Sequence, residues 1–222
     1  MTTVGTHSVV RDAPVLTAAG VVKAFRRGPW SPRSSTSVLR GVDLALNAGE
    51  VVGLVGENGS GKSTLMKILV GALAADAGSV TWTGRLGYCP QRPELYQRLT
   101  CDEHVEAFGR AYGMTPAGVL AARTALYESL GFGRYASVQA GQLSGGTAAK
   151  LNLTLALLAD PPVLMLDEPY AGFDWETYLR FWEIVDQRRA AGRSTLLISH
   201  FVVDEGRFDR IVALRDGIAV PR

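Results

Sequence analysis

The sequence predicts an α/β fold with a mostly parallel β-sheet, and three observations support that class. Residues 51–56 (VVGLVG) form a short, continuously apolar run, as expected for a central parallel strand that is buried on both faces. A glycine-rich stretch separates this run from an apolar, helix-like segment, so a strand gives way to a helix. Further strands at 163–168 and 194–199, separated by a helix at about 175–190, continue the alternation.

Composition limits the size of the fold and its surroundings. The 222 residues fit one α/β domain with an inserted subdomain, and the 47 % of apolar residues can fill a substantial core. The formal charge of +2 is too small to indicate a nucleic-acid or membrane-surface role, and we expect no nucleic-acid partner. The most apolar stretch, residues 151–166, is interrupted by Asp160-Pro161-Pro162, and neither half reaches the ~20 residues that span a bilayer. Any work at a membrane therefore requires another chain to cross it.

The two cysteines, Cys89 and Cys101, do not have the spacing of a metal site. The N-terminus shows no signal peptide, so we expect two reduced thiols in a cytosolic protein. The cysteines therefore predict neither a disulfide nor a metal centre.

The N-terminal region predicts a tail followed by two strands. Residues 1–14 are polar and unpatterned, as in a loose tail, and apolar periodicity runs from Val15 to residue 25. Residues 26–37 (RRGPWSPRSSTS) contain two prolines, a glycine and four serines, which predicts a surface loop. An alternating strand follows and ends at an Ala48-Gly49 turn.

Between residues 93 and 141 the sequence pattern becomes typical of helices. Thr100 and Glu103 have the spacing of a capping box, which predicts a helix through about residue 112. Thr115-Pro116 predicts a second helix, with proline at its first position, that ends near residue 131. We therefore expect a helical subdomain at about 92–145, inserted into a single domain that covers 15–222.

Strand and helix alternation returns after the helical region. A helix is predicted at about 145–159, ahead of the strand at 163–168. The chain then closes with a strand pair at 210–220, around the turn Asp216-Gly217. The helical region is thus flanked on both sides by α/β sequence.

The glycine-rich stretch matches the phosphate-loop pattern G-x-x-x-x-G-K-[ST], with a strand before it and a helix after it. Successive backbone N–H groups and the positive end of the helix can bind a phosphate there. Lys62 can bridge two phosphates, and the Ser63 hydroxyl can reach Mg²⁺. The alternative is a glycine-rich turn without a ligand. The predicted nucleotide-binding residues of this stretch are Gly56, Glu57, Asn58, Gly59, Ser60, Gly61, Lys62, Ser63 and Thr64.

Two adjacent carboxylates end the predicted strand at 163–168. In a phosphate-loop fold such a strand lies beside the loop, so Asp167 can hold Mg²⁺ through water while Glu168 faces the attacking water. A strand that ends in acidic residues is common, and the pairing with the phosphate loop is what makes this one informative.

Residues 143–147 (LSGGT), just upstream of the acidic strand, resemble the signature sequence LSGGQ of ABC-type ATPases. From about Val15 to its C-terminus the chain resembles the nucleotide-binding subunit of that family. Four further positions agree in order. They are Phe25 where the family contacts adenine, Gln91 of YCPQ in the Q-loop, Asp174 of AGFD in the D-loop, and His200 of ISH as the switch histidine.

The resemblance implies a P-loop NTPase core with a mostly parallel sheet, an N-terminal antiparallel β portion and an inserted helical subdomain. It implies ATP and Mg²⁺ as ligands, with Ser63, Gln91 and Asp167 at the metal. The implied catalytic side chains are Glu168, His200, Gln91 and Lys62. Ser144, Gly145 and Gly146 would bind, in trans, the γ-phosphate held by a second ATPase subunit, either this chain or a homologue.

Each residue taken from the resemblance also has a plainer interpretation. Gln91 would be an ordinary loop amide, and Ser144 a simple helix N-cap. His200 would be a satisfied surface or core histidine. Phe25 would be a core residue at the end of an apolar strand.

The chain departs from the family pattern at three places. Thr147 replaces the usual glutamine of the signature, Phe173 replaces a leucine of the D-loop, and the loop at 26–37 is longer than a minimal subunit needs. None of these positions is an expected phosphate ligand. They bear instead on the subunit interface and the hydrolysis rate.

The resemblance implies an ATP-hydrolysing subunit that powers a membrane transporter, and the stretch after Gln91 favours an exporter. A separate membrane-spanning permease would dock on the helical subdomain, placing the chain peripherally on the cytoplasmic face of the cell membrane. A soluble ABC ATPase that acts on ribosomes or DNA is the alternative, although such relatives generally carry two such domains or a long coiled-coil insertion. A regulatory protein that binds ATP without transport is a third possibility.

Overall fold

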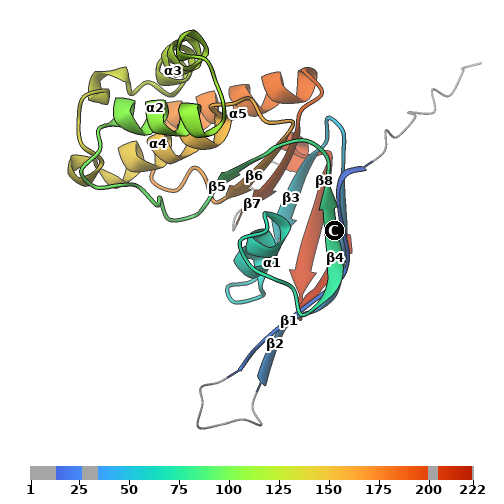
Figure 1. The fold of residues 1–222 in the computed structure, drawn as a ribbon. Helices are drawn as coiled ribbons and strands as arrows, with labels where there is room; N and C mark the ends of the chain where they lie inside the picture. Colours follow the sequence, from blue (N-terminus) through green and yellow to red (C-terminus); the bar gives the residue numbers. More distant parts are fainter. Residues whose placement is uncertain (1–13, 27–34, 200–204, 222) are drawn as a thin grey trace, which may run out of the picture.

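The computed structural model describes residues 14–26, 35–199 and 205–221, which form two β-sheets and the helices that cover them (Figure 1). The larger sheet has six strands in the order β5-β6-β7-β3-β8-β9. Neighbours from β5 to β8 pair in parallel and β9 pairs antiparallel with β8, so the predicted mostly parallel sheet is confirmed. Its strands are β3 (Val51–Val55), β5 (Leu86–Cys89), β6 (Val163–Asp167), β7 (Ser194–Ile198), β8 (Arg210–Arg215) and β9 (Ile218–Pro221).

The smaller sheet is antiparallel, with strands in the order β2-β1-β4. Its strands are β1 (Pro14–Arg26), β2 (Ser35–Asn47) and β4 (Ala77–Trp82). The predicted loop at 26–37 is wrong at both ends, because Arg26 pairs with Ser35 and Ser37 pairs with Ala24. Strand pairing between β1 and β2 outweighs the weak strand preference of a serine-rich segment.

The helices fall into two groups. They are α1 (Lys62–Leu69), α2 (Cys101–Ala111), α3 (Pro116–Leu130), α4 (Gly145–Leu157) and α5 (Trp175–Ala190). Figure 1 shows α2 to α5 gathered near the β5 side of the large sheet, with α1 apart from them. The capping box of Thr100 and Glu103 and the Thr115 N-cap are both present as predicted.

The central strands divide their side chains between two cores, because successive residues of a strand point to opposite faces. Val51, Leu164 and Leu197 pack with α2 to α5 on one face. Val52 and Met165 pack on the other face with α1 and the antiparallel sheet. The molecule is therefore layered, and the large sheet is the layer common to both cores.

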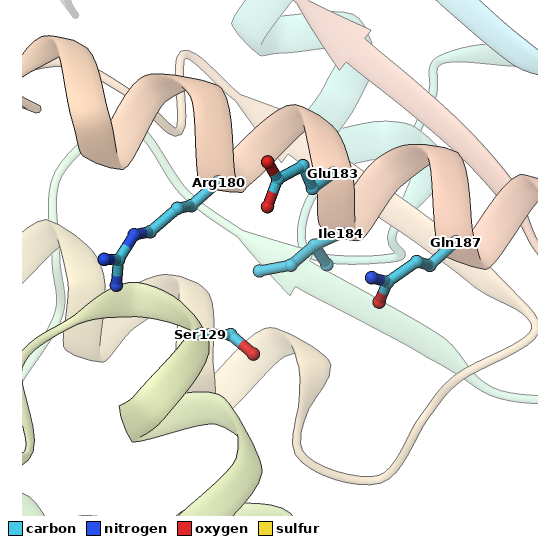
Figure 2. A pocket seen from close by; sticks show the side chains of 5 residues that line it. All are labelled: Ser129, Arg180, Glu183, Ile184 and Gln187. Carbon is cyan, nitrogen blue, oxygen red and sulfur yellow. The ribbon is translucent and has the colours of Figure 1, made fainter.

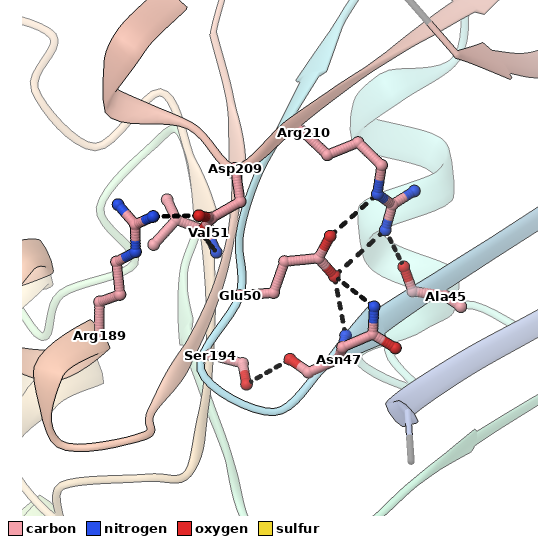
Figure 3. Close-up of polar contacts among 8 residues, drawn as sticks. All are labelled: Ala45, Asn47, Glu50, Val51, Arg189, Ser194, Asp209 and Arg210. Atoms are coloured by element: carbon pink, nitrogen blue, oxygen red, sulfur yellow. Dashed lines mark hydrogen bonds and ion pairs between the residues drawn. The ribbon is translucent and has the colours of Figure 1, made fainter. Parts of the chain in front are cut away.

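A polar network fixes the antiparallel sheet to the amino ends of the central strands (Figure 3). Glu50, just before β3, accepts hydrogen bonds from the Asn47 N–H at 2.9 Å and from Arg210 Nε at 2.9 Å. Arg210 Nη2 also donates to the Ala45 carbonyl at 2.6 Å, and the Ser194 hydroxyl donates to the Asn47 carbonyl at 2.8 Å. This edge of the sheet is thus a structural anchor, and the opposite, carboxyl edge carries the candidate site.

Candidate functional site

The site lies at the carboxyl ends of three adjacent parallel strands, where ligands bind in open α/β sheets. β3 lies between β7 and β8, and β6 lies beside β7. β3 leads into the glycine-rich loop, β6 ends at Asp167, and β7 ends two residues before His200. His200 itself is outside the described residues, so its predicted role stays a prediction.

The glycine-rich loop requires glycine because of its backbone conformation and its close packing against neighbouring strands. Gly56, Gly59 and Gly61 all have positive φ angles. A Cβ on Gly56 would lie 2.5 Å from the Leu214 carbonyl oxygen, and one on Gly61 would lie 2.9 Å from Val38 Cγ1. The backbone of the loop therefore sits close against β8 and β2, and a larger residue at either glycine would displace it.

Lys62 folds back over the loop that precedes it. Its side chain is only 5 % exposed, and Nζ donates to the carbonyl oxygens of Gly56 at 2.8 Å and Glu57 at 2.9 Å. Burial lowers the pKa of the Lys62 ammonium, while the carboxylates of Glu168 and Asp167 act in the opposite direction. The cation is thus placed between the loop and the acidic strand end.

The N-terminus of α1 is suited to an anion. Its N-cap is Gly61, which supplies no side-chain hydrogen bond, and its first turn contains no acidic residue. The first N–H groups of a helix lack intrahelical partners and carry partial positive charge. Ser63 and Thr64 lie half-buried in that turn. The Ser60 hydroxyl nearby is buried and has no hydrogen-bond partner within the described ranges.

The acidic pair separates into two environments. Asp167 is the last residue of β6 and is 2 % exposed. Glu168 lies beyond the strand, with φ +52°, and its N–H donates to the Ile198 carbonyl at 3.1 Å. The strand therefore ends one residue earlier than predicted, because the chain turns out of the sheet at Glu168.

The signature motif begins α4, and its residues have distinct environments. Ser144 is the N-cap, and its Oγ accepts from the Thr147 N–H at 3.3 Å, so the plainer N-cap role is present. A Cβ on Gly146 would lie 2.5 Å from the Gly172 carbonyl oxygen, whereas one on Gly145 would meet no described atom within 4 Å. The described chain thus explains Gly146 and leaves Gly145 unexplained.

Asp174 is the N-cap of α5 and accepts the Thr177 N–H at 2.8 Å. This hydrogen bond, to a carboxyl at the surface, lowers the pKa of Asp174. The D-loop that precedes it contacts the start of α4, since Gly172 meets Gly146. The signature and the D-loop, predicted separately from the sequence, therefore lie side by side.

Gln91 and Phe25 are both exposed. Gln91 lies just after β5, outside any helix or strand. The Phe25 ring is 43 % exposed, near the end of β1, with Lys23 Nζ 5.7 Å from its centroid. The core interpretation of Phe25 is therefore wrong, and its contact with adenine stays a prediction.

Sequence reasoning missed two polar side chains near the site. The Tyr170 hydroxyl lies 2.5 Å from the Ser199 hydroxyl and connects the turn after Glu168 to the end of β7. Burial raises the pKa of the Tyr170 phenol, so it stays protonated and can donate. The second is Asn152, in the interior of α4, whose Nδ2 donates to the carbonyl oxygen of the residue just before Gln91. Neither residue belongs to a motif, and no periodic signal marks them.

A separate groove of about 180 Å³ lies between α3 and α5 (Figure 2). Its lining residues are Ser129, Arg180, Glu183, Ile184 and Gln187. Arg180 donates from Nη1 to the Glu128 carbonyl at 3.3 Å and pairs through Nη2 with Glu176 at 2.6 Å. The groove contains none of the predicted site residues and marks a contact between the helical segment and α5.

The fold and the site together define a class of protein. A phosphate loop joins a buried central strand to a helix, and a buried lysine crosses it. The acidic strand β6 ends at the same edge of the sheet but is not the loop strand's direct neighbour as predicted, because β7 lies between them. This is the arrangement of a P-loop nucleoside triphosphatase. Magnesium suits its donors, because Ser63, Asp167 and Gln91 offer the oxygen ligands that Mg²⁺ prefers.

Comparison with known proteins identifies the family. The family model "ABC transporter" matches residues 39–171, more than half of the chain. The chain therefore belongs to the ABC transporter family and is an ATP-binding, ATPase-type domain of it. None of the described helices combines the length and the apolar character that a membrane span requires.

Relatives and solved structures agree with that assignment. The chain is 34 % identical over 193 residues to the "Nod factor export ATP-binding protein I" of Burkholderia lata, covering 81 % of this chain and 64 % of that protein. It is 34 % identical to the human "Phospholipid-transporting ATPase ABCA7", covering 94 % of this chain and 10 % of that protein. The chain thus spans between a tenth and two thirds of these relatives. A solved "ATP binding subunit of ABC transporter" superposes with a TM-score of 0.84 at 27 % identity, covering 92 % of this chain and 88 % of that one.

Proposed function

We propose that the chain is the ATP-hydrolysing subunit of a membrane exporter, and that ATP-driven closure and opening of a dimer powers transport. The observation that carries the proposal is the position of Lys62. Its ammonium lies on the phosphate loop, within electrostatic reach of both Asp167 and Glu168. One cation thus connects the groups that would hold the phosphates with the groups that would act on them.

Binding follows from the loop and the helix behind it. The uncapped N–H groups of α1 donate hydrogen bonds to the phosphate oxygens, and Lys62 exchanges its bonds to the Gly56 and Glu57 carbonyls for bonds to those oxygens. Ser63, Asp167 and Gln91 would hold Mg²⁺, which supplies charge neutralisation to the phosphates when bound. The exposed ring of Phe25 is available to stack on adenine.

Hydrolysis requires a base or an orienting group that faces water. Glu168 fits this role, because its position outside β6 leaves it more exposed than Asp167. It orients or deprotonates water for in-line attack on the γ-phosphate, and His200 stabilises the charge that develops. Asp167, buried at the strand end, would instead help to hold the Mg²⁺ that neutralises the phosphates.

The signature would act on the nucleotide of a second subunit. Gly145 supports this, because it lies at an exposed helix start where a Cβ would meet no atom within 4 Å among the described residues. A close approach by another molecule explains the lack of a side chain, and the Ser144 hydroxyl and helix N–H groups can bind a phosphate there. Loss of the γ-phosphate then removes the contacts that join the two subunits.

The partner of the ATPase pair is a separate membrane-spanning permease that docks on the helical subdomain, about 92–145. The name of one relative, a Nod factor export protein, supports export, and that of another, a phospholipid-transporting ATPase, supports transport. The subunit is then peripheral, on the cytoplasmic face of the cell membrane.

The decisive experiment uses tagged Glu168→Gln protein, expressed in its own cells and purified with Mg·ATP from detergent-solubilised membranes. The variant should bind ATP, scarcely hydrolyse it and dimerise stably, so that the complex survives purification. A multi-span hydrophobic protein in stoichiometric amount, identified by mass spectrometry, would support the transporter. The matched control is Lys62→Met/Glu168→Gln, which should recover less of it. The proposal would be rejected if the Glu168→Gln variant and the control were both recovered only from the soluble fraction, whether bound to ribosomes, bound to DNA or without a partner.

A further inference from the structure

Asn152 is a buried polar side chain in the middle of α4 that the steps above do not use. It is 7 % exposed, and its Nδ2 donates to the Pro90 carbonyl oxygen at 2.8 Å and to Cys89 Sγ at 3.2 Å. A buried amide destabilises a fold unless it is hydrogen-bonded. Here both bonds go to a segment more than sixty residues away along the chain, so the side chain joins two distant parts of the fold.

The contact extends over one turn of the helix. Asn152 and Ala156 are four residues apart and share a face of α4, while Gly87 and Cys89 are two apart and share a face of β5. A Cβ on Gly87 would lie 2.3 Å from the Ala156 carbonyl oxygen, so helix and strand backbones touch there. Helix α4 thus contacts β5 at two positions along the strand. One is the close backbone packing at Gly87, and the other is the pair of hydrogen bonds at the C-terminal end of the strand.

The atom that Asn152 holds controls the direction of the next residue. The Pro90 carbonyl oxygen lies in the same peptide plane as the N–H of Gln91, and that plane does not twist. The proline ring also restricts φ of Pro90, the backbone rotation about the N–Cα bond that precedes this plane. Holding this one oxygen therefore sets the direction in which Gln91 leaves the sheet.

We propose that Asn152 is a positioning residue for Gln91. It holds the Pro90-Gln91 peptide against α4, whose N-terminus carries Ser144, so that Gln91 and the signature keep a fixed relative position. The inference rests on the proposed function, in which Gln91 acts at the metal. A displacement of either motif is then transmitted to the other through one amide group.

Thr154 provides a matched control. It is also polar, fully buried and in α4, but its hydroxyl donates to the Lys150 carbonyl of its own helix at 2.9 Å. Thr154→Val therefore removes a buried hydrogen bond within the same helix and leaves the hydrogen bonds to Cys89 and Pro90 in place. Asn152→Leu keeps the branching of the side chain at Cγ and removes both N–H donors.

The first readout is the alkylation rate of Cys89 without nucleotide, measured by peptide mass spectrometry. We expect a roughly fivefold rise in Asn152→Leu, the factor that corresponds to one lost hydrogen bond, and no change in Thr154→Val. Cys101 is also buried, and the hydrogen bonds that Asn152 donates within the described residues go to Cys89 and Pro90, so Cys101 is the internal reference. An unchanged ratio of Cys89 to Cys101 labelling in Asn152→Leu would overturn the proposed clamp. Asn152→Ala repeats the measurement should the leucine variant not fold.

The second readout is a double-mutant cycle in kcat for ATP. Asn152→Leu should lower kcat roughly three- to tenfold, and should have no further effect in a Gln91→Ala background. An equal fall in both backgrounds would show that Asn152 acts on stability alone, and the inference would fail by itself. Wild-type turnover by Gln91→Ala would instead remove the proposed role of Gln91, and with it the target of Asn152.

Discussion

The hydroxyl oxygens of Ser144 and Thr147 lie 3.0 Å apart at the N-terminus of α4. Thr147 also donates its N–H to Ser144 Oγ at 3.3 Å, and its own side chain is buried. If both groups of Thr147 donate, the proton of Ser144 points outward, toward the place where a phosphate would bind. Thr147, which replaces the usual glutamine of the signature, is thus in direct contact with Ser144, three residues earlier in the same motif.

Thr147→Val should lower ATP turnover while leaving the helix intact. The variant keeps the shape and the N–H cap but loses the hydroxyl, so we expect a fall in kcat of roughly two- to tenfold, the effect of one hydrogen bond. Thr147→Ser, which retains the hydroxyl, should hydrolyse ATP nearly as fast as the wild type. Equal kcat values for the valine and serine variants would contradict the role of this contact.

Lys62→Met should weaken ATP binding without unfolding the domain. The thioether replaces the buried stem, and the lost charge-assisted hydrogen bonds predict a roughly 10- to 100-fold rise in Kd, measured by calorimetry. Lys67→Met is the matched control, because Lys67 lies in the same helix and is exposed. The prediction would be wrong if both variants bound ATP with wild-type affinity.

Alanine at the two signature glycines should separate folding from function. Gly146→Ala places a Cβ against the Gly172 carbonyl and should cost about 1–3 kcal/mol of stability, seen as a lower Tm. A Cβ at position 145 meets no described atom within 4 Å, and alanine favours a helix over glycine, so the Tm of Gly145→Ala should equal or exceed that of the wild type. ATP-driven dimer formation by Glu168→Gln protein should nevertheless be lost in this variant. A dimer that still forms in Gly145→Ala/Glu168→Gln, measured by size-exclusion chromatography, would argue against an approach by a second subunit at this glycine.

Asp174 should give the domain an acid-dependent stability term. Its pKa in the folded state is lowered from 3.8 by the hydrogen bonds from Thr177, so its contribution is complete above that value. As the pH falls from about 5 through the lowered pKa, the carboxyl is protonated and this contribution is lost. Asp174→Asn keeps a helix cap that does not titrate, so urea titrations should show the wild type losing stability relative to the variant below pH 4. A constant difference across that range would exclude the carboxyl as the cause.

The parts of the fold that the sequence predicts are those with local physical signals. The run at 51–55 is apolar because β3 is buried on both faces, and Thr100 and Glu103 are close enough in the chain to cap α2 by themselves. The phosphate loop is predicted for the same reason, since its conformation and its ligand groups are contiguous.

The parts that the sequence does not predict depend on contacts between distant segments. β4 is mostly exposed and shows no burial alternation, so only its pairing with β1 makes it a strand. The need for glycine at 56 and 146 comes from the Leu214 and Gly172 carbonyls, which the motifs do not indicate. Asn152 has no sequence signal at all, because its partners at Cys89 and Pro90 approach it only in the folded chain.

The division of strand residues between two cores has a consequence for how this domain can change over evolutionary time. Leu164 and Leu197 belong to the packing of α2 to α5, while Val52 and Met165 belong to that of α1. Substitutions at the first set of positions can change the packing of the helical layer, on which a new partner would dock. Such substitutions leave the side chains beneath the phosphate loop in place. Recognition and chemistry can thus diversify at different rates within one small domain.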